Sequence, residues 1–282
     1  MHPTTYISGA TGYAGLKLVE SLARQGDNLL LSARDENRLQ EIAESLYIKY
    51  PNQSFRVFTC DLAVPASWDS AVREISDSQI NKYLNCSGVQ GFLGPSSEIS
   101  HEEINRVFNV NLFSSIYFTN YLSKKLKGEE KLSIIHFSGG GSTSPRPLFM
   151  SYSLSKTSLL RFVENFAAEN RNPNIRINAI APGIMPSKMQ NEIINTHGLL
   201  DTKDFLDAER SLSNANFDFI KILNLCNFLL SDESEGITGK LISAEWDDWA
   251  EWPSHIPEIK DSDVYTLRRI VGRDRGLEWG DV

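Results

Sequence analysis

A tyrosine and a lysine four residues apart, Tyr152 and Lys156, stand at the start of a long segment with apolar residues at helical spacing. Positions i and i+4 lie on one face of a helix, so the phenol and the ammonium would project into the same space. A cation close to a phenol favours the phenolate and lowers its pKa from about 10 toward neutrality, where the phenol can give or take a proton. The same spacing also occurs on half-exposed amphipathic helices, so the pair needs a cofactor-binding fold to support it.

A glycine-rich segment near the N-terminus, 9–15, follows an expected strand at 6–8 and opens an expected helix. Glycines at this point permit a tight turn, let backbone N–H groups approach a pyrophosphate, and let the helix pack closely on the strand. The position after a strand and before a helix favours dinucleotide binding over an ordinary glycine-rich turn. The residues that we expect to contact the cofactor here are Gly9, Thr11, Gly12, Tyr13, Ala14 and Gly15.

The second expected strand, 29–31, ends at Ser32-Ala33-Arg34, where a dinucleotide fold places the residue that meets the adenosine ribose. An acidic side chain there would bond the ribose 2′-hydroxyl, whereas Arg34 could pair with a 2′-phosphate. We therefore expect NADP (NADPH) in preference to NAD, with Arg38 nearby as a second possible cation. The alternative is an arginine that only caps the end of a surface strand.

Five further apolar runs alternate with helical patterns, and we expect strands at 55–60, 83–84, 132–137, 175–180 and 240–243. This alternation predicts a doubly wound, Rossmann-like α/β sheet of about seven parallel strands flanked by helices, with its ligand at the carboxyl ends of the strands. Polar residues follow the third and fourth strands and should lie at the cofactor. These expected contacts are Asp61, Leu62, Asn85, Ser87 and Gly88.

Long helices are expected at 101–127, 152–170 and 217–230, from apolar residues at helical spacing. Asn111 lies within the apolar pattern of the first helix, and a buried amide needs hydrogen-bond partners. It is either a functional group or a polar side chain that satisfies nearby backbone. The first two helices carry apolar residues on more than one face, which favours assembly of several copies. Residues 186–216 are polar and irregular apart from short helical patches, which suits a mobile flap over a pocket.

The chain has 282 residues and no linker-like break, repeat or low-complexity tract, so we expect one domain over 1–282. No apolar run reaches the roughly 18 residues of a membrane span, and the N-terminus lacks the features of a signal peptide, so we expect a cytoplasmic protein. Its three separated cysteines indicate reduced, buried thiols and no metal site. The net charge of −8 argues against a nucleic-acid partner and leaves a small-molecule ligand.

Taken in order, the short motifs of the chain resemble those of the small single-domain branch of the short-chain dehydrogenase/reductase family. The resemblance runs from residue 6 to about 243, and it implies a Rossmann-like fold, a nicotinamide cofactor and a homodimer or homotetramer. The matching motifs are the glycine turn 9–15, Asp61-Leu62, Asn85-Cys86-Ser87-Gly88, Asn111-Leu112, Ser138, Tyr152 with Lys156, and 178–183 with Ser187. Three further cofactor contacts follow from it, namely Pro182, Gly183 and Ser187.

The resemblance also implies a catalytic tetrad of Asn111, a serine, Tyr152 and Lys156. Tyr152 would pass a proton to or from the substrate oxygen, and the serine hydroxyl would hold that oxygen. Lys156 would lower the tyrosine pKa and grip the nicotinamide ribose. Asn111 would order a water that leads the proton to solvent.

The chain departs from the family pattern at the catalytic serine. That serine usually lies about thirteen residues before the tyrosine, and Gly139 stands there in this chain. We favour Ser138, with Ser142 as the alternative, because three consecutive glycines allow the loop to shift by a residue. The glycine spacing of 9–15 is a second departure, since it is typical of the longer branch that modifies sugar nucleotides.

The C-terminal segment, 244–282, is atypical of the family and carries Trp246, Trp249 and Trp252 among acidic residues. These tryptophans could stack on a sugar ring, form a subunit contact, or cover the domain's own apolar surface.

We therefore expect an NADP-dependent oxidoreductase that interconverts a secondary alcohol and a ketone by hydride transfer, with a sugar-type substrate as one option. One alternative is a nucleotide-sugar epimerase or dehydratase, which the glycine spacing favours. The other is a non-catalytic dinucleotide-binding sensor on the same fold.

Overall fold

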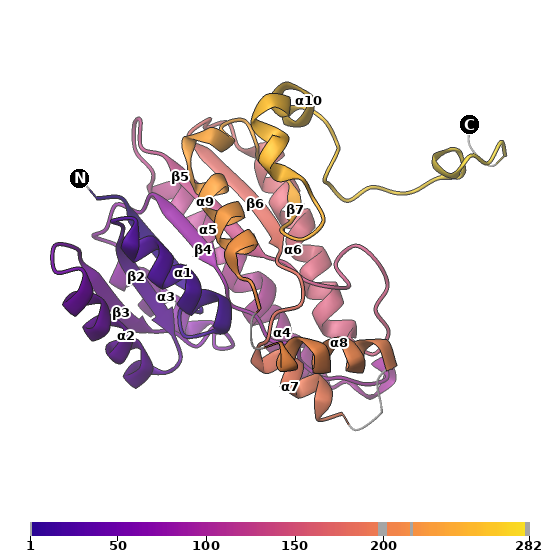
Figure 1. The fold of residues 1–282 in the computed structure, drawn as a ribbon, viewed down its shortest axis with the longest axis horizontal. Coiled ribbons are helices and arrows are strands. Elements are labelled where there is room, and N and C mark those ends of the chain that lie inside the picture. The colour runs from indigo at the N-terminus through magenta and orange to yellow at the C-terminus, as the bar shows by residue number, and fades with distance from the viewer. Residues whose placement is uncertain (1, 197–201, 215–216, 280–282) are drawn as a thin grey trace.

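Seven strands form one parallel sheet with helices on both faces, in a computed structural model that describes residues 2–196, 202–214 and 217–279 (Figure 1). The predicted fold class, a Rossmann-like α/β sheet, is confirmed. The order of the strands across the sheet is β3-β2-β1-β4-β5-β6-β7. The strands are β1 Thr4–Ser8, β2 Asn28–Ala33, β3 Phe55–Thr59, β4 Lys82–Asn85, β5 Leu132–Phe137, β6 Ile175–Ala181 and β7 Leu241–Ser243.

Burial on both faces explains why the central strands read as nearly continuous apolar runs. Every residue of β5 is buried, and so is every residue of β6 except the last. A strand covered by helices on both faces has no solvent side on which to alternate polar residues. The two halves of the sheet meet where β1 pairs with β2 on one side and with β4 on the other. At such a reversal of strand order the carboxyl ends leave a crevice for a ligand.

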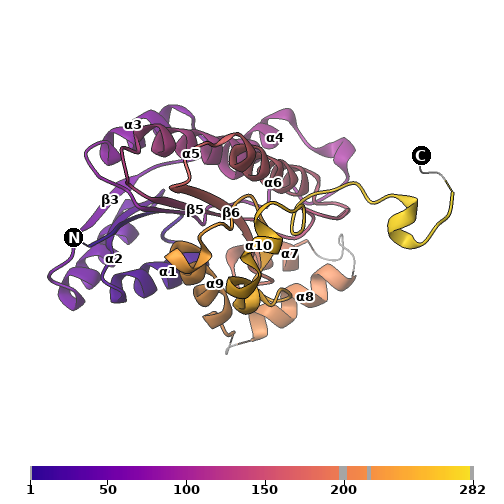
Figure 2. The ribbon, with the colours of Figure 1, turned by 90° about the horizontal axis from the view of Figure 1, so that it is seen from above.

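Two helical layers cover the sheet (Figure 2). One layer packs α1, α2 and α9 on one face, and the other packs α3, α5 and α6 on the opposite face. The helices are α1 Tyr13–Arg24, α2 Glu36–Lys49, α3 Ala66–Ile75, α4 His101–Phe108, α5 Ser114–Lys125, α6 Met150–Glu169, α7 Lys188–Ile194, α8 Thr202–Ser213, α9 Ile220–Leu230 and α10 Ile256–Lys260. Short 3₁₀ segments lie at Ser96–Glu98, Asp232–Ser234, Trp249–His255 and Gly272–Arg275.

The helix expected over 101–127 differs from one continuous α-helix. A π-helical turn, Asn109–Phe113, joins α4 to α5. A π turn inserts one extra residue and is often found at a functional site. Asn111 lies inside it and is almost fully buried. Apolar periodicity cannot reveal such a turn, because the residues on either side keep their helical spacing.

The short helical patches expected in the flap, 186–216, are two defined helices. The flap holds α7 and α8, while 197–201 and 215–216 lie outside the described residues. Among the residues that the structure does describe, no helix is long and apolar enough to cross a membrane.

The atypical C-terminal segment first covers the domain and then leaves it. Trp249 stacks on Phe228 at 5.8 Å between ring centroids, and the buried Trp252 lies 4.3 Å from Tyr265. The backbone N–H of Leu241 donates to the carbonyl of Tyr265 at 2.8 Å, so the segment also shields the edge strand β7. Beyond Arg268 the chain extends away from the body of the molecule (Figures 1 and 2). Two of the three tryptophans therefore cover apolar surface of their own domain.

Candidate active site

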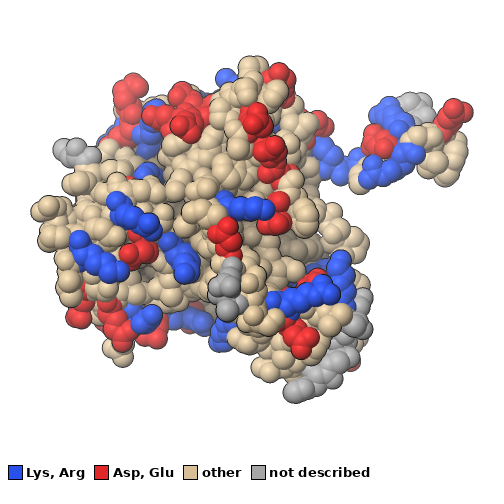
Figure 3. Space-filling view, viewed as in Figure 1, with Lys and Arg blue, Asp and Glu red and all other residues tan. Residues whose placement is uncertain are grey.

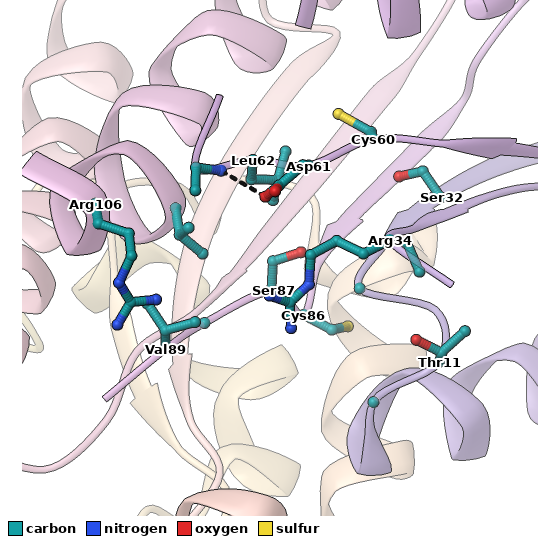
Figure 4. A pocket seen from close by; sticks show the side chains of 16 residues that line it. Thr11, Ser32, Arg34, Cys60, Asp61, Leu62, Cys86, Ser87, Val89 and Arg106 are labelled. Carbon is teal, nitrogen blue, oxygen red and sulfur yellow. Dashed lines mark hydrogen bonds between the residues drawn. The ribbon is translucent and has the colours of Figure 1, made fainter. Parts of the chain in front are cut away.

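Two cavities open at the carboxyl edge of the sheet and share the turn 86–88. The first has a volume of about 170 Å³, and residues from the ends of β1 to β4 line it (Figure 4). The second, of about 600 Å³, lies beside Tyr152. Of the predicted residues, the first cavity is lined by Gly9, Thr11, Gly12, Arg34, Asp61, Leu62, Ser87 and Gly88. The second is lined by Ala14, Ser87, Gly88, Ser138, Ser142, Tyr152, Lys156, Pro182, Gly183 and Ser187.

The glycine turn between β1 and α1 leaves no room for a side chain at two of its glycines. Gly9 has a φ of +76°, and a Cβ added to it would lie 2.8 Å from the Ser87 hydroxyl oxygen. A Cβ on Gly15 would lie 2.2 Å from the Gly9 carbonyl oxygen, so its absence lets α1 pack against the turn. Gly12 precedes α1 without a side-chain cap, and the first turn of the helix holds no acidic residue. The first N–H groups of α1 are therefore available to an anion, which fits a dinucleotide.

The two cations expected near the adenosine ribose have different surroundings. Arg34 follows β2 and lines the first cavity (Figure 4). Arg38 instead forms an exposed ion pair with Glu41 at 2.7 Å. The only neighbouring acid before α2, Asp35, accepts a hydrogen bond from the Arg38 backbone N–H at 3.0 Å and caps that helix. Of the two arginines, only Arg34 therefore reaches the cavity.

Two predicted contacts have side chains that are engaged with protein rather than with a cavity. The ring of Tyr13 packs against those of Phe217 and Phe219, with centroids 6.2 and 5.9 Å away. The buried amide of Asn85 accepts from the Ser8 hydroxyl at 2.8 Å and donates to the Ser115 hydroxyl at 2.6 Å. Asn85 thus ties the turn after β4 to β1 and α5, and its contact with a cofactor stays a prediction.

Tyr152 and Lys156 lie on one face of α6, as their spacing indicates, but the pKa of Tyr152 is shifted in the opposite sense to the expectation. The Lys156 Nζ lies 6.0 Å from the centre of the Tyr152 ring and donates to the Phe137 carbonyl at 2.7 Å. Burial raises the pKa of Tyr152 and lowers the pKa of Lys156 to about 8. The expected lowering of the phenol pKa is therefore wrong for the cofactor-free chain, because loss of hydration disfavours both charged forms.

Asn111 has all its side-chain hydrogen bonds within the protein. Its Oδ1 accepts from the Val89 backbone N–H at 2.9 Å, and its Nδ2 donates to the Val89 carbonyl and to the Ser155 hydroxyl, both at 2.9 Å. These bonds hold the loop after β4 against the first turns of α6. The ordered water assigned to Asn111 by resemblance stays a prediction, while the alternative role of satisfying nearby backbone is observed.

Position 139, where the family's serine usually stands, is the one that faces the tyrosine. A Cβ added to Gly139 would lie 2.1 Å from the Tyr152 hydroxyl oxygen. Ser138, one residue earlier, is buried, and its hydroxyl has no hydrogen-bond partner among the described residues. Ser142 is also buried beside the same cavity. The catalytic role of Ser138 stays a prediction, because the residue closest to the phenol in this comparison, at position 139, is a glycine without a side chain.

Several lining residues were not among the predicted ones. Arg106, on α4, lines the first cavity (Figure 4), and Gln90 and Asp204 line the second. Arg146 also lines the second cavity, and its Nε and Nη2 donate to Asp204 Oδ1 at 3.1 and 2.8 Å. Only the two prolines that flank Arg146 mark it in the sequence, since Asp204 lies 58 residues away.

Comparison with known proteins identifies relatives over most of the chain. The family model described as enoyl-(acyl carrier protein) reductase matches residues 12–245. A diacetyl reductase [(S)-acetoin forming] of Staphylococcus epidermidis is 26% identical over 252 residues, which cover 86% of this chain and 96% of that protein.

Two solved structures share the fold at low sequence identity. An NADPH-dependent reductase involved in bacilysin biosynthesis has a TM-score of 0.75 at 20% identity, over 86% of this chain and 97% of that one. An NAD⁺-bound xylitol dehydrogenase has a TM-score of 0.73 at 22% identity, over 86% and 96% of the two chains. The arrangement of the strands is thus that of a known group of proteins.

Proposed function

This chain belongs to the short-chain dehydrogenase/reductase family of oxidoreductases, and from that membership we propose that it interconverts a secondary alcohol and a ketone with NADP as its cofactor. The observation that carries the proposal is the shared turn 86–88, which joins the glycine-turn cavity to the cavity that holds Tyr152 and Lys156. A dinucleotide bound along this path would run from Arg34 to the phenol. The two cavities, which share this turn, would then hold the cofactor and the substrate next to one another.

The bound cofactor would supply the acceptor or donor of a hydride. Oxidation removes a hydride from the carbinol carbon and a proton from its oxygen, so a ketone, a reduced cofactor and one proton result. Tyr152 would take that proton, or return it in the reverse direction. Because burial raises the pKa of Tyr152, the phenol is protonated at neutral pH in the free chain and is ready to act as a proton donor to a ketone.

The remaining residues of the site would hold the reactants. The Lys156 Nζ lies beside the turn 86–88, since a Cβ added to Gly88 would be 3.6 Å from it. From there it could bond the ribose next to the nicotinamide. Ser138 would bond the substrate oxygen if the glycine loop moved, because its hydroxyl is unpartnered at the base of that loop.

Arg34 supports NADP over NAD. It lines the first cavity at the end of β2, whereas the nearby acid Asp35 already caps α2. A guanidinium suits a 2′-phosphate, while a carboxylate would be needed for a free 2′-hydroxyl. The relatives include both an NADPH-dependent and an NAD⁺-bound enzyme, so the preference rests on this residue.

A sugar-type or polyol substrate is supported by the walls of the second cavity. Trp246 lines this cavity and is 84% exposed, unlike the two tryptophans that follow it. An aromatic face beside amides and carboxylates, here Gln90 and Asp207, suits a ring with several hydroxyl groups. A relative with this fold acts on xylitol, whereas another reduces diacetyl, so the proposal covers hydroxylated ketones first.

A homodimer or homotetramer is proposed from the surface of the long helices. Phe113, next to α5, and Leu154, on α6, are 43% and 50% exposed. Large apolar side chains on adjoining helices are suited to burial against a second copy. The cytoplasmic location expected from the sequence stays a prediction.

The proposal is tested by following NADPH and NADH oxidation with a panel of diketones, keto-sugars and simple ketones. We expect turnover with at least one hydroxylated ketone and loss of nearly all turnover in Tyr152→Phe, with cofactor binding retained. Ser138→Ala should lower turnover by about 10²–10³-fold, as for the loss of one oxyanion donor. Cofactor binding without turnover on any substrate would favour the alternative of a non-catalytic sensor, which the glycine at 139 makes worth testing.

A further inference from the structure

The glycine loop that follows β5 lies between Tyr152 and a half-buried arginine. A Cβ added to Gly139 would lie 2.1 Å from the Tyr152 hydroxyl oxygen, and one added to Gly140 would lie 3.5 Å from Nη1 of Arg146. A Cβ on Gly141 would lie 3.1 Å from the Cβ of Arg146. Neighbouring glycines thus face the phenol and the arginine in turn. Because the loop has no side chains here, both groups lie close to its backbone.

The position of Arg146 is held by several independent features. Prolines at 145 and 147 restrict the backbone on either side of it. Leu148 has a φ of +68°, a strained value for a residue with a branched side chain, and strain of this kind gathers at functional sites. The guanidinium lies 3.6 Å from the ring centre of the fully buried Phe149. An arginine needed only for solubility would not be fixed in this way.

One edge of the guanidinium is occupied and the other faces the loop. Nε and Nη2 both donate to Asp204 on α8, at 3.1 and 2.8 Å, and the two side chains are 23% and 26% exposed. Within 2–196, 202–214 and 217–279, we find no hydrogen bond donated by Nη1. The donors of Nη1 therefore remain beside the loop, on the wall of the cavity that contains Tyr152.

The charge of Arg146 acts on the phenol. Burial raises the pKa of Tyr152, and the nearby Arg146 works against that rise. The pKa of Lys156 is lowered to about 8, so its charge fades in alkaline solution, whereas an arginine stays charged at every accessible pH. The charged or titratable groups that line this cavity with the phenol are Lys156 on α6, Arg146 on the loop, Cys86 after β4, and Lys203, Asp204 and Asp207 on α8.

We propose that Arg146 is a positioning residue that acts through Tyr152, by stabilising the negative charge on the phenol oxygen after its proton has moved to the substrate. The phenolate persists until a proton from solvent replaces the one transferred, and Arg146 supplies a permanent positive charge during that interval. The inference rests on the proposed function for its use in turnover. Its effect on the ionisation of Tyr152 does not depend on any substrate.

The first test measures the ionisation of Tyr152 directly. Phenolate formation is followed by ultraviolet absorbance against pH in the cofactor-free protein. For each variant, the titration curve of the same variant carrying Tyr152→Phe is subtracted, which leaves the signal of Tyr152. Arg146→Met should raise the midpoint of Tyr152 by about one pH unit or more, because a nearby positive charge is lost. Arg146→Lys should retain most of the original midpoint. Arg161→Met, which removes an arginine from the exposed side of α6, serves as the matched control and should leave it unchanged.

The second test uses the substrate identified in the ketone screen. In the direction of alcohol oxidation, the pH at which kcat/KM rises should move upward in Arg146→Met by the same amount as the titration midpoint, with recovery in Arg146→Lys. An unchanged midpoint and pH profile, with only KM raised, would overturn the proposal and assign Arg146 to substrate binding.

A further variant covers the case in which Arg146→Met does not fold. Asp204→Asn leaves the guanidinium in place without its counter-ion, so the Tyr152 midpoint should fall. A midpoint that stays or rises there contradicts the proposal. Because the titration needs neither cofactor nor ketone, a failed substrate screen would count against the proposed function and leave the result on Arg146 intact.

Discussion

Arg34 is the residue on which the choice of cofactor depends. Arg34→Ala should weaken the binding of NADPH by about 10- to 150-fold relative to NADH, the equivalent of ~1.5–3 kcal/mol for a charge-assisted contact. The measurement is the dissociation constant of each cofactor by titration calorimetry. Arg38→Ala is the matched control, because that arginine is paired with Glu41 on the surface. Equal losses for both cofactors in Arg34→Ala would contradict the assignment to NADP.

His136 is a buried titratable residue whose neutral form is needed by the fold. It accepts from the Asn85 amide at 3.3 Å and meets the Thr119 hydroxyl at 3.1 Å, and burial lowers its pKa to about 3. In the unfolded chain a histidine has a pKa of about 6.5, so below that pH it binds a proton that the buried side chain of the folded protein does not bind. Its contribution to stability is therefore complete above about pH 6.5 and is lost progressively as the pH falls toward 3.

The expected size of this effect can be measured. Between pH 6.5 and 5 the single group should reduce the free energy of unfolding by about 1.6 kcal/mol, because the slope rises from about 0.7 kcal/mol per pH unit at pH 6.5 toward about 1.4 at pH 5. Urea denaturation at both pH values, in the parent and in His136→Gln, shows how much less the free energy of unfolding changes with pH in the variant. His101→Gln, at an exposed position, is the control and should keep the parent's slope. The same slope in all three proteins would rule out His136 as the group responsible.

Individual residues of the site could be predicted from the sequence where a single short motif is enough to identify them. Tyr152 and Lys156 share a helical face because their spacing alone requires it, and the cavity beside them confirms that they lie together. Arg146 gave no such signal, because its partner Asp204 lies 58 residues later. The direction of the Tyr152 pKa shift could not be predicted from the motif either, since it depends on how much water the folded chain removes from the phenol.

The glycine loop after β5 is the element whose shape sets the position of Tyr152. Gly139 and Gly140 do not have the positive φ that would exclude other residues, so alanine is acceptable to the backbone at both. Their surroundings differ, however, since an added Cβ would lie 2.1 Å from the Tyr152 hydroxyl at 139 and 3.5 Å from Arg146 at 140. Only the first substitution forces a neighbouring group to move.

This difference gives a prediction with its own matched control. Gly139→Ala should displace the phenol by about 1 Å and lower turnover by about 10²-fold, since misplacement on that scale is enough to disrupt a reacting geometry. Gly140→Ala should lower turnover much less. Turnover and thermal unfolding are measured for both, and the melting temperatures should stay close to the parent's. Equal activities in the two variants would show that Tyr152 tolerates the added methyl group and that the loop does not set its position.

Whole elements were predictable to different degrees, for physical reasons that particular segments make clear. All seven strands were expected, because buried parallel strands leave long apolar runs such as 132–137. The π turn at Asn109–Phe113 was not, because the apolar residues on either side of it keep their helical spacing. Likewise, short helical patches were expected in 186–216, but the bounds of α7 and α8 were not, because apolar spacing gives little guidance in a polar segment.

At the scale of the whole molecule, the C-terminal arm is the part of the chain that extends from the domain instead of packing on it. We define the arm as 269–279. Just before it, Leu267 and Arg268 are held to α6 by Glu164, through a hydrogen bond of 2.5 Å and an ion pair of 3.4 Å. Within the arm, Ile270, Leu277 and Trp279 are 62%, 46% and 75% exposed. Figure 3 shows the arm extended from the body, with basic side chains along it.

An arm that leaves the domain beside α6 is well placed to reach the second copy proposed to pack on the same helix. Replacing Ile270, Leu277 and Trp279 together by serine in the full chain should then weaken assembly. Each apolar side chain that becomes fully buried contributes about 1.5–3 kcal/mol, so the dissociation constant should rise by about 10³-fold or more. Sedimentation analysis over a range of concentrations measures this, with Ile48→Ser on α2, 83% exposed, as the control. Because the three side chains are largely exposed in the isolated chain, the melting temperature of the monomer should not change. An unaltered mass in the triple variant would mean that the arm does not join the copies. A parent protein that is monomeric at all concentrations would contradict the proposed oligomer itself.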